Sequence, residues 1–168
     1  MSGFWRESTV EPKRKFRWIL SVGEGQIPAW IIKKVTKPTF TISEVKHSFI
    51  NHSFYYPGRV EYNEIEFTLV DPVEPDAAQG LINLIEASGY TYPDSEALAK
   101  QTITKAEAVE ALNHCYIQQI DAEGATMEEW YLENCWVKEV NFGDLDYESD
   151  DINEITVKVR YDFAQKNV

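Results

Sequence analysis

Near its C-terminus the chain reads Ile155-Thr156-Val157-Lys158-Val159-Arg160-Tyr161-Asp162-Phe163. Apolar side chains occupy every second position of this stretch, and polar side chains occupy the positions between them. This period of two is typical of a half-buried antiparallel strand, which has one face on a core and the other toward solvent. The pattern therefore predicts a strand over residues 155–163 that pairs with neighbouring strands.

Six other runs with strand patterns precede this one. They cover residues 16–22, 29–35, 39–45, 60–70, 115–121 and 127–140. The last two runs predict a hairpin around Glu123-Gly124. Within the second of them, residues 130–137 carry large apolar side chains on both faces, which predicts a strand that is covered on both sides. The second cover is either a helix of the same chain or another subunit.

Two helices are expected between the strands. Asp76 can cap a helix over residues 77–88, which places Leu81, Leu84 and Ile85 on one face and ends at Gly89. Thr104 and Glu107 have the spacing of a capping box, which predicts a second helix over residues 105–113. The fold class is therefore mainly β with one or two short helices (α+β).

Residues 46–59 have no clean period and are rich in aromatic side chains. The segment is interpreted as a long loop or an extended hairpin. Aromatic side chains on such a segment favour contact with a partner. The aromatic residues are Phe49, Phe54, Tyr55 and Tyr56.

Length and composition predict one folded domain. The chain has 168 residues, of which 43% are hydrophobic and 13% aromatic, so it can bury a core of its own. Residues 1–14 are expected to form a flexible N-terminal arm with Phe4 and Trp5 as exposed anchors, and residues 15–168 the single β domain. No apolar run approaches the ~18 residues of a membrane span, so no membrane insertion is expected. Cys115 and Cys135 are too few for a disulfide scaffold and are expected to be packed thiols.

The charge is distributed unevenly along the chain. Residues 1–60 hold ten Lys and Arg against four acidic residues, a balance of +6, whereas residues 61–168 hold six against twenty-four, a balance of −18. One interpretation is a solvated acidic surface. The other is a polar subunit whose basic part, including Lys33 and Lys34, meets the acidic part of another copy. Direct binding of nucleic acid is disfavoured because phosphate contacts need a basic surface.

Catalytic and ligand motifs are not supported by the sequence. The acidic turn that contains Asp144 and Asp146 lacks the glycine and the glutamate of a calcium loop, because Ser149 and Ile155 occupy those positions. The three histidines, His47, His52 and His114, have no metal-ligand spacing. No catalytic residue, metal or cofactor is therefore expected, and the protein is not expected to be an enzyme.

Three stretches together resemble the tail tube proteins of contractile-tailed bacteriophages. They are residues 60–72, which end in Asp71-Pro72, the turn at residues 141–147, and the Asn153-Glu154 step with its strand to Asp162. The resemblance covers residues 14–163. It implies two packed antiparallel sheets, forming a sandwich or barrel with a flanking helix. In that family six copies close into a ring, and rings stack into a hollow tube through which DNA passes without specific binding.

The resemblance also implies partners and a location. The partners are other copies of the chain within and between rings, the tail sheath, the baseplate and the tape-measure protein. The subunit would assemble in the host cytoplasm and reside in the virion tail. We expect contacts between subunits at Phe4, Trp5, Lys33, Lys34, Phe49, Phe54, Tyr55, Tyr56, Trp136, Asp144 and Asp146.

Two alternatives remain at this point. The same fold serves type VI secretion tubes and phage-derived injection particles, and the long segment between Gly89 and His114 would suit a specialised ring that initiates the tube at the baseplate. A monomeric ligand-binding β-barrel is the more distant alternative. It is weakened because the sequence has no His-x-His pair for a metal site.

Overall fold

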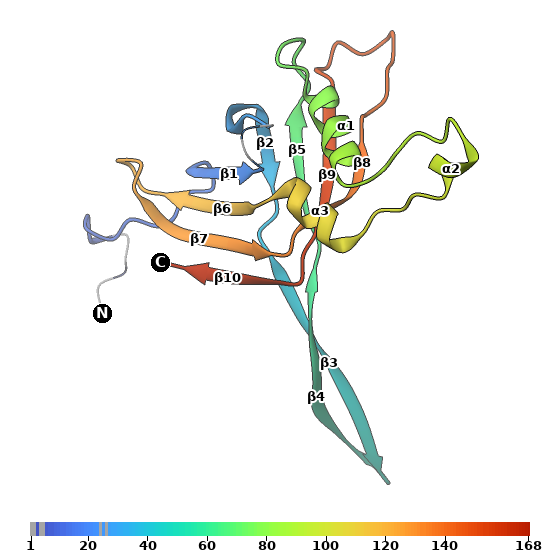
Figure 1. Ribbon diagram of the computed structural model, residues 1–168. Coiled ribbons are helices and arrows are strands. Elements are labelled where there is room, and N and C mark those ends of the chain that lie inside the picture. The colour runs from blue at the N-terminus through green and yellow to red at the C-terminus, as the bar shows by residue number, and fades with distance from the viewer. Residues whose placement is uncertain (1–2, 4–5, 24, 26) are drawn as a thin grey trace.

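Two four-stranded antiparallel sheets form the body of the protein in its computed structural model, which describes residues 3, 6–23, 25 and 27–168 (Figure 1). The first sheet has the order β1-β6-β7-β10, with β1 at Trp18–Val22, β6 at Cys115–Ile120, β7 at Thr126–Glu133 and β10 at Phe163–Asn167. The second has the order β2-β5-β9-β8, with β2 at Ile32–Val35, β5 at Ile65–Val70, β9 at Glu154–Arg160 and β8 at Trp136–Asn141. The strands of one sheet run across those of the other (Figure 1). This is the expected pair of packed antiparallel sheets.

The alternating side chains of the C-terminal stretch fill the core. Ile155, Val157 and Val159 of β9 are fully buried and lie opposite Leu69, Phe67 and Ile65 of β5 in the register of the two strands. The buried members from the other sheet and from the first helix are Leu20, Val22, Cys115, Ile117, Leu132, Leu81 and Leu84. The two-residue period therefore predicted correctly which side chains of β9 face the core.

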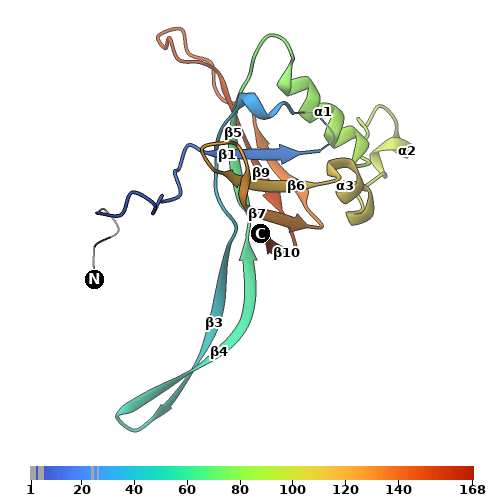
Figure 2. The same cartoon turned by 90° about the vertical axis from the view of Figure 1, so that its left-hand side faces the viewer.

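Helices cover one side of the second sheet (Figures 1 and 2). Helix α1 spans Ala77–Ala87, and the Asp76 side chain accepts a hydrogen bond from the backbone of Gln79 at 3.1 Å. Helix α3 spans Lys105–Leu112 and packs against α1 and β8, with the Thr104 hydroxyl accepting from the backbone of Glu107 at 3.3 Å. Both predicted caps are confirmed. A short helix, α2 at Glu96–Ala99, was not predicted.

Two predicted strands are each divided between the sheets. The stretch 155–163 is wrong as a single strand, because β9 ends at Arg160 and β10 begins at Phe163 in the other sheet. The run 127–140 is likewise split into β7 and β8, with Asn134 between them at a positive φ of 52°. A side-chain period reports which face is buried, and it carries no information on which sheet a strand joins. The helix α3 on β8 supplies a cover within the chain.

Two further boundaries differ from prediction. The first strand was expected to begin at Phe16, but Phe16 is 74% exposed and lies before β1 begins at Trp18. The run 29–35 begins as a 3-10 helix, η2 at Ala29–Ile31, and only then continues as β2. Ile31 of η2 is buried and joins the core without joining a strand ladder.

A long hairpin projects from the body (Figures 1 and 2). It consists of β3 at Thr39–Phe49 and β4 at His52–Asn63, which pair with each other and form a sheet of their own. Residues 46–59 are therefore the outer part of an extended hairpin, and the loop interpretation is wrong. The predicted strand 39–45 is too short, because β3 continues to Phe49. The predicted strand 60–70 is too long, because it joins the end of β4 to a separate strand, β5.

Candidate subunit interface

The hairpin is the most exposed regular structure in the described chain. Each strand of 11 or 12 residues reaches roughly 35 Å at the usual rise of about 3.3 Å per residue. Nearly every residue on it is exposed, including Phe49 at 63%, Phe54 at 51% and Tyr56 at 57%. A two-stranded ribbon with an uncovered apolar face is marginally stable in water. The hairpin therefore carries surface that a partner would bury.

A bulge divides the hairpin into two parts. Ile42 lies opposite Val60 and Glu44 lies opposite Pro57, so β4 has one extra residue between the two pairs. The backbone N–H of Arg59 donates to Ser43 Oγ at 2.9 Å within this bulge. An extra residue shifts the alternation of β4 relative to β3. The apolar stripe of the hairpin consequently changes face at the bulge.

Near the body, the apolar stripe packs on the protein itself. Phe40 lies opposite Tyr62, whose ring centre is 5.8 Å from that of Phe40 and 5.9 Å from that of the buried Tyr161. These tilted aromatic contacts fasten the hairpin base to the end of β9.

Beyond the bulge, the apolar stripe lies on the other face, and no described residue outside the hairpin covers it. The cross-strand pairs of this tip face are Val45 with Tyr56, His47 with Phe54, and Phe49 with His52. Three of the four predicted hairpin aromatics, Phe49, Phe54 and Tyr56, therefore share a face. Tyr55 lies on the opposite face, paired with Lys46.

A buried carboxylate holds the base of the hairpin and the N-terminal segment together. Glu128 on β7 is 5% exposed and forms ion pairs with Lys13 and with Lys37, the latter at 2.9 Å. Trp130 Nε1 donates to the same carboxylate. The hydrogen bond from Lys13, supported by those from Lys37 and Trp130, lowers the pKa of Glu128 from 4.5 to about 2 despite burial. The flexibility predicted for residues 1–14 stays a prediction.

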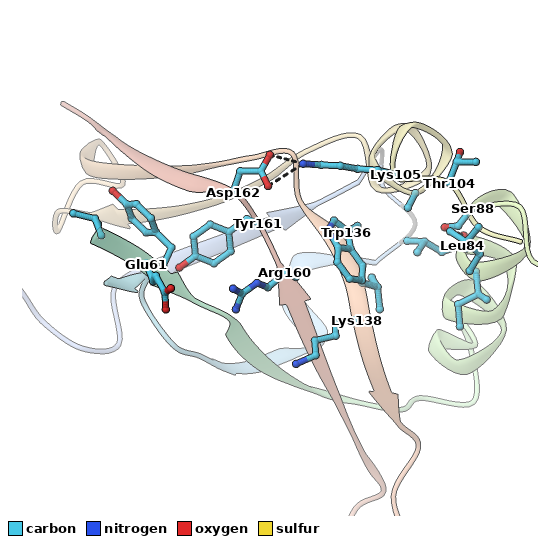
Figure 3. A pocket seen from close by; sticks show the side chains of 16 residues that line it. Glu61, Leu84, Ser88, Thr104, Lys105, Trp136, Lys138, Arg160, Tyr161 and Asp162 are labelled. Atoms are coloured by element: carbon cyan, nitrogen blue, oxygen red, sulfur yellow. Dashed lines mark hydrogen bonds and ion pairs between the residues drawn. The ribbon is translucent and has the colours of Figure 1, made fainter. Parts of the chain in front are cut away.

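A groove of ≈ 870 Å³ opens between the helices, β8, β9 and the base of the hairpin (Figure 3). Its buried floor includes Leu84, Ser88 and Ala108, and its apolar walls include Trp136 and the half-exposed Ile103. Trp136 was predicted as a contact residue and lies here, on the edge strand β8.

Three cationic side chains and two carboxylates, Glu61 and Asp162, line this groove. Lys105 donates to Asp162 at 2.7 Å, and Lys138 donates to Glu64 at 2.6 Å, which lowers the pKa values of both carboxyl groups. Arg160 lies opposite Trp136 in the register of β8 and β9, and its side chain extends away from Trp136 (Figure 3). Among the described residues its guanidinium has no hydrogen-bond or ion-pair partner, although its charge contributes to the lowered pKa of Glu64. Among the described cations that line the groove, Arg160 is therefore the one without an ion pair.

The β8–β9 loop, residues 142–153, is the acidic turn noted in the sequence. The predicted contact residues Asp144 and Asp146 lie on it, with Glu148, Asp150 and Asp151, and all are exposed. Leu145 and Tyr147 are also almost completely exposed between the carboxylates. Within the described chain no lysine or arginine forms an ion pair with these five carboxylates. Five carboxylates that have no ion pair among the described residues are thus clustered on one projecting loop.

Of the remaining predicted contact residues, Lys33 borders the acidic β8–β9 loop, and two others lie outside the structural description. Lys33 on β2 forms an ion pair with Glu154, and its neighbour Lys34 is exposed. Phe4 and Trp5 lie outside the described residues. The cysteines Cys115 and Cys135 are buried thiols, and burial raises the pKa of Cys135 to about 11.

The described residues contain no group of three or more His, Cys, Asp and Glu side chains arranged to hold a metal ion. In the same part of the chain, no helix has the length and apolar character that crossing a membrane requires.

The architecture resembles solved structures of contractile injection machines. Neither a known family model nor a curated protein sequence matches the chain. A chain from the PVC sheath/tube terminator of an extracellular contractile injection system superposes with a TM-score of 0.68 at 16% identity, covering 96% of this chain and 100% of that one. A chain from the 6-fold symmetrised baseplate of the anti-feeding prophage gives 0.66 at 12% identity, covering 95% and 97%. This protein has the tail-tube fold.

The PVC sheath-tube complex contains another chain with the tail-tube fold that matches this protein, with a TM-score of 0.62 at 16% identity over 99% of both chains. The fold expected from the sequence resemblance is therefore confirmed. Because tail-tube folds occur in tube, terminator and baseplate structures alike, the fold by itself leaves the position in the machine undetermined.

Sequence reasoning missed several residues of these surfaces. Leu145 and Tyr147 could have been found from the sequence, because they are apolar residues inside an acidic run. Glu128, Arg160 and Ile103 had no such signal, because their positions depend on strands and helices brought together by the fold.

Proposed function

We propose that the chain is a structural subunit of the tube of a contractile injection machine. In this proposal six copies close into a ring, and rings stack into a hollow conduit. The 6-fold symmetry of the similar baseplate structure supports the ring, and the similar sheath-tube structure supports the stack. The work of such a protein is done by assembly and shape, without a reaction centre.

The uncovered tip face of the hairpin is the observation that carries the proposal. Phe49, Phe54 and Tyr56 lie together on a ribbon that reaches beyond the body, where the protein's own core cannot cover them. A contact with a copy in the adjacent ring would bury them. Large exposed apolar patches on a soluble protein mark interaction sites.

Open sheet edges supply the second kind of contact. Strands β2 and β8 are the edges of one sheet, and β1 and β10 are the edges of the other. An edge strand presents unpaired backbone N–H and C=O groups that another chain can pair with. In the proposal, pairing of edges between neighbouring copies closes the ring and protects the edges from aggregation.

The proposed partners beyond other copies are the sheath around the tube, the baseplate below it and, in a phage tail, the tape-measure protein. The proposed location is the assembled particle or virion tail, after assembly in the cytoplasm of the producing cell. In a phage tail the conduit would pass DNA. Its passage would be eased by a negatively charged lumen, which repels phosphates.

A ring at the end of the tube is the second candidate. The similar structures include a tube terminator, a tube-terminating cap and a baseplate. The segment of residues 90–104, with its exposed helix α2, projects from the helical side and could face a specialised partner there (Figure 1). A terminal ring would stop after one or a few layers.

Negative-stain microscopy and light scattering of the purified protein test the proposal. Long tubes of stacked rings are expected for a tube subunit. Isolated rings would instead support the terminal-ring candidate. A protein that remains monomeric at all concentrations and salt conditions would contradict both.

A further inference from the structure

The groove and the acidic β8–β9 loop lie at opposite ends of the same two strands. Strand β8 begins in the groove at Trp136 and ends before the loop, and β9 begins after the loop and ends in the groove at Arg160 (Figure 1). Seven residues of β9 separate the two ends by roughly 20 Å at the usual strand rise. No residue of the loop at 142–153 lines the groove of its own chain.

The loop carries the features of a docking segment. Leu145 is 93% exposed, and Tyr147 exceeds the reference exposure of a free side chain at 110%. Two apolar side chains held fully in solvent at the tip of a loop gain contact area only by meeting another surface. Carboxylates flank both of them, so a suitable surface must combine apolar walls with cationic groups.

The groove offers that combination. Trp136 and Ile103 supply apolar walls that are accessible from outside, while Arg160 has no ion-pair partner in the described chain. A volume of ≈ 870 Å³ is sufficient for two side chains and the loop backbone that carries them. Lys105 and Lys138 stand at the same opening, although each already has an acidic partner.

We propose that the acidic β8–β9 loop of one copy docks in the groove of a neighbouring copy. Leu145 and Tyr147 cover Trp136 and Ile103, and the adjacent carboxylates face Arg160. The occupant is a second copy because this chain itself provides both complementary surfaces. A contact between two different patches repeats from copy to copy and produces a closed ring or an open filament. The inference rests on the proposed self-assembly and names one surface pair that drives it.

Directed cross-linking tests the contact. Glu148→Cys places a thiol beside the loop anchors and keeps Tyr147, and Ile103→Cys places one on the groove wall. The two single variants are mixed and oxidised, with the native cysteines buried and unreactive. A disulfide-linked dimer is expected in the mixture, at a yield at least tenfold above that of either variant alone.

A matched pair distinguishes the other possible occupant. Ser48→Cys, on the hairpin tip, is mixed with Ile103→Cys under the same conditions. Preferential cross-linking of this pair would show that a hairpin fills the groove, and it would overturn the proposal.

Charge reversal provides a second measurement. Arg160→Glu is expected to lower the cross-linking yield of the loop–groove pair at least tenfold. Lys100→Glu, which makes the same charge change at the C-cap of α2 outside the groove, should leave the yield unchanged. Equal yields for the two variants would overturn the docking.

The outcome is separable from that of the proposed function. Rings or tubes that form without the loop–groove cross-link would overturn only the docking contact. A cross-link between copies that form no rings would support the contact and count against the tube proposal.

Discussion

The ammonium group of Lys37 lies 2.9 Å from the carboxylate of Glu128, although 91 residues separate them in the sequence. Lys37 stands at the base of the projecting hairpin, and Lys13 of the N-terminal segment binds the same carboxylate. Lys37 also donates to Gln119 at 2.9 Å, and the Gln119 side chain donates to the backbone carbonyl of Arg14. One buried group on β7 thus sets the position of two segments expected to meet other copies.

Replacement of this carboxylate tests its structural role. Glu128→Gln should lower the free energy of unfolding by about 1 to 3 kcal/mol, because charge-assisted hydrogen bonds from two lysines become weaker neutral ones. Urea denaturation measures the change. Glu129→Gln, the neighbouring change, is the control and should have a smaller effect. Equal effects would contradict the role assigned to Glu128.

The lowered pKa of Glu128 predicts that its contribution to the free energy of unfolding is lost in acid. The pKa of Glu128 is lower in the folded protein than in the unfolded chain, where it is near 4.5. Its contribution is therefore complete above about pH 4.5 and is lost as the pH falls toward 2. The difference in stability between the wild type and Glu128→Gln, measured by urea denaturation, should shrink over this range. A constant difference between pH 6 and pH 3 would argue against the lowered pKa.

The hairpin aromatics should affect assembly much more than stability. Phe54→Ser combined with Tyr56→Ser should change the free energy of unfolding by less than about 1 kcal/mol, because both side chains are exposed in the subunit. The yield of rings or tubes, counted by electron microscopy, should fall severalfold. Val73→Ser, at a residue 99% exposed outside the hairpin, is the matched control. Undiminished assembly of the double variant would remove the main support for the proposed function.

The bulge of the hairpin should be intolerant of a side chain at Gly58. A Cβ there would lie 2.2 Å from Ser43 Oγ and 3.0 Å from the Ser43 carbonyl oxygen. Gly58→Ala should therefore disturb the bulge and speed hydrogen exchange of the hairpin amides, with less than about 1 kcal/mol effect on global unfolding. Adding Ser43→Gly should restore part of the protection, since it removes the nearer clash. Unchanged exchange in Gly58→Ala would contradict the geometry.

Truncation of a buried core side chain should lower the free energy of unfolding more than truncation of an exposed side chain. Leu69 is fully buried between the sheets, so Leu69→Ala should lower the free energy of unfolding by about 2 to 5 kcal/mol. Ile152→Ala, at a residue 68% exposed in the β8–β9 loop, should cost less than about 1 kcal/mol. Chemical denaturation of both variants provides the comparison.

Charge pairing between copies is tested best at Lys34. Lys33 and Lys37 have acidic partners inside the chain, whereas Lys34 has none among the residues described. Lys34→Glu should therefore weaken assembly without a large loss of stability, and the loss should diminish at high salt as screening weakens charge contacts. Light scattering at low and high salt measures this. Lys100→Glu is the control for the change in net charge, and equal assembly of the two variants would defeat the charge-pairing idea.

Local patterns were sufficient for the elements whose signals are local. The caps at Asp76 and Thr104 follow from one side chain and the backbone amide three residues later, so both helices begin where the sequence predicts. The alternation around Val157 and Leu69 follows from the two-residue period of a strand, so the core faces were also predictable. The acidic loop was recognisable because carboxylates without nearby cations remain in solvent.

The fold class, the core faces and the chemistry of the exposed segments could be predicted from local sequence patterns. Three features emerge only from the folded arrangement: the chain crosses between sheets at Asn134 and Tyr161, the hairpin projects with its apolar tip uncovered, and Arg160 and Trp136 border a groove. The difference lies in the range of the interactions. Caps and periods arise between residues a few positions apart, whereas sheet membership, a carboxylate shared by two distant lysines and a groove depend on segments far apart in the chain.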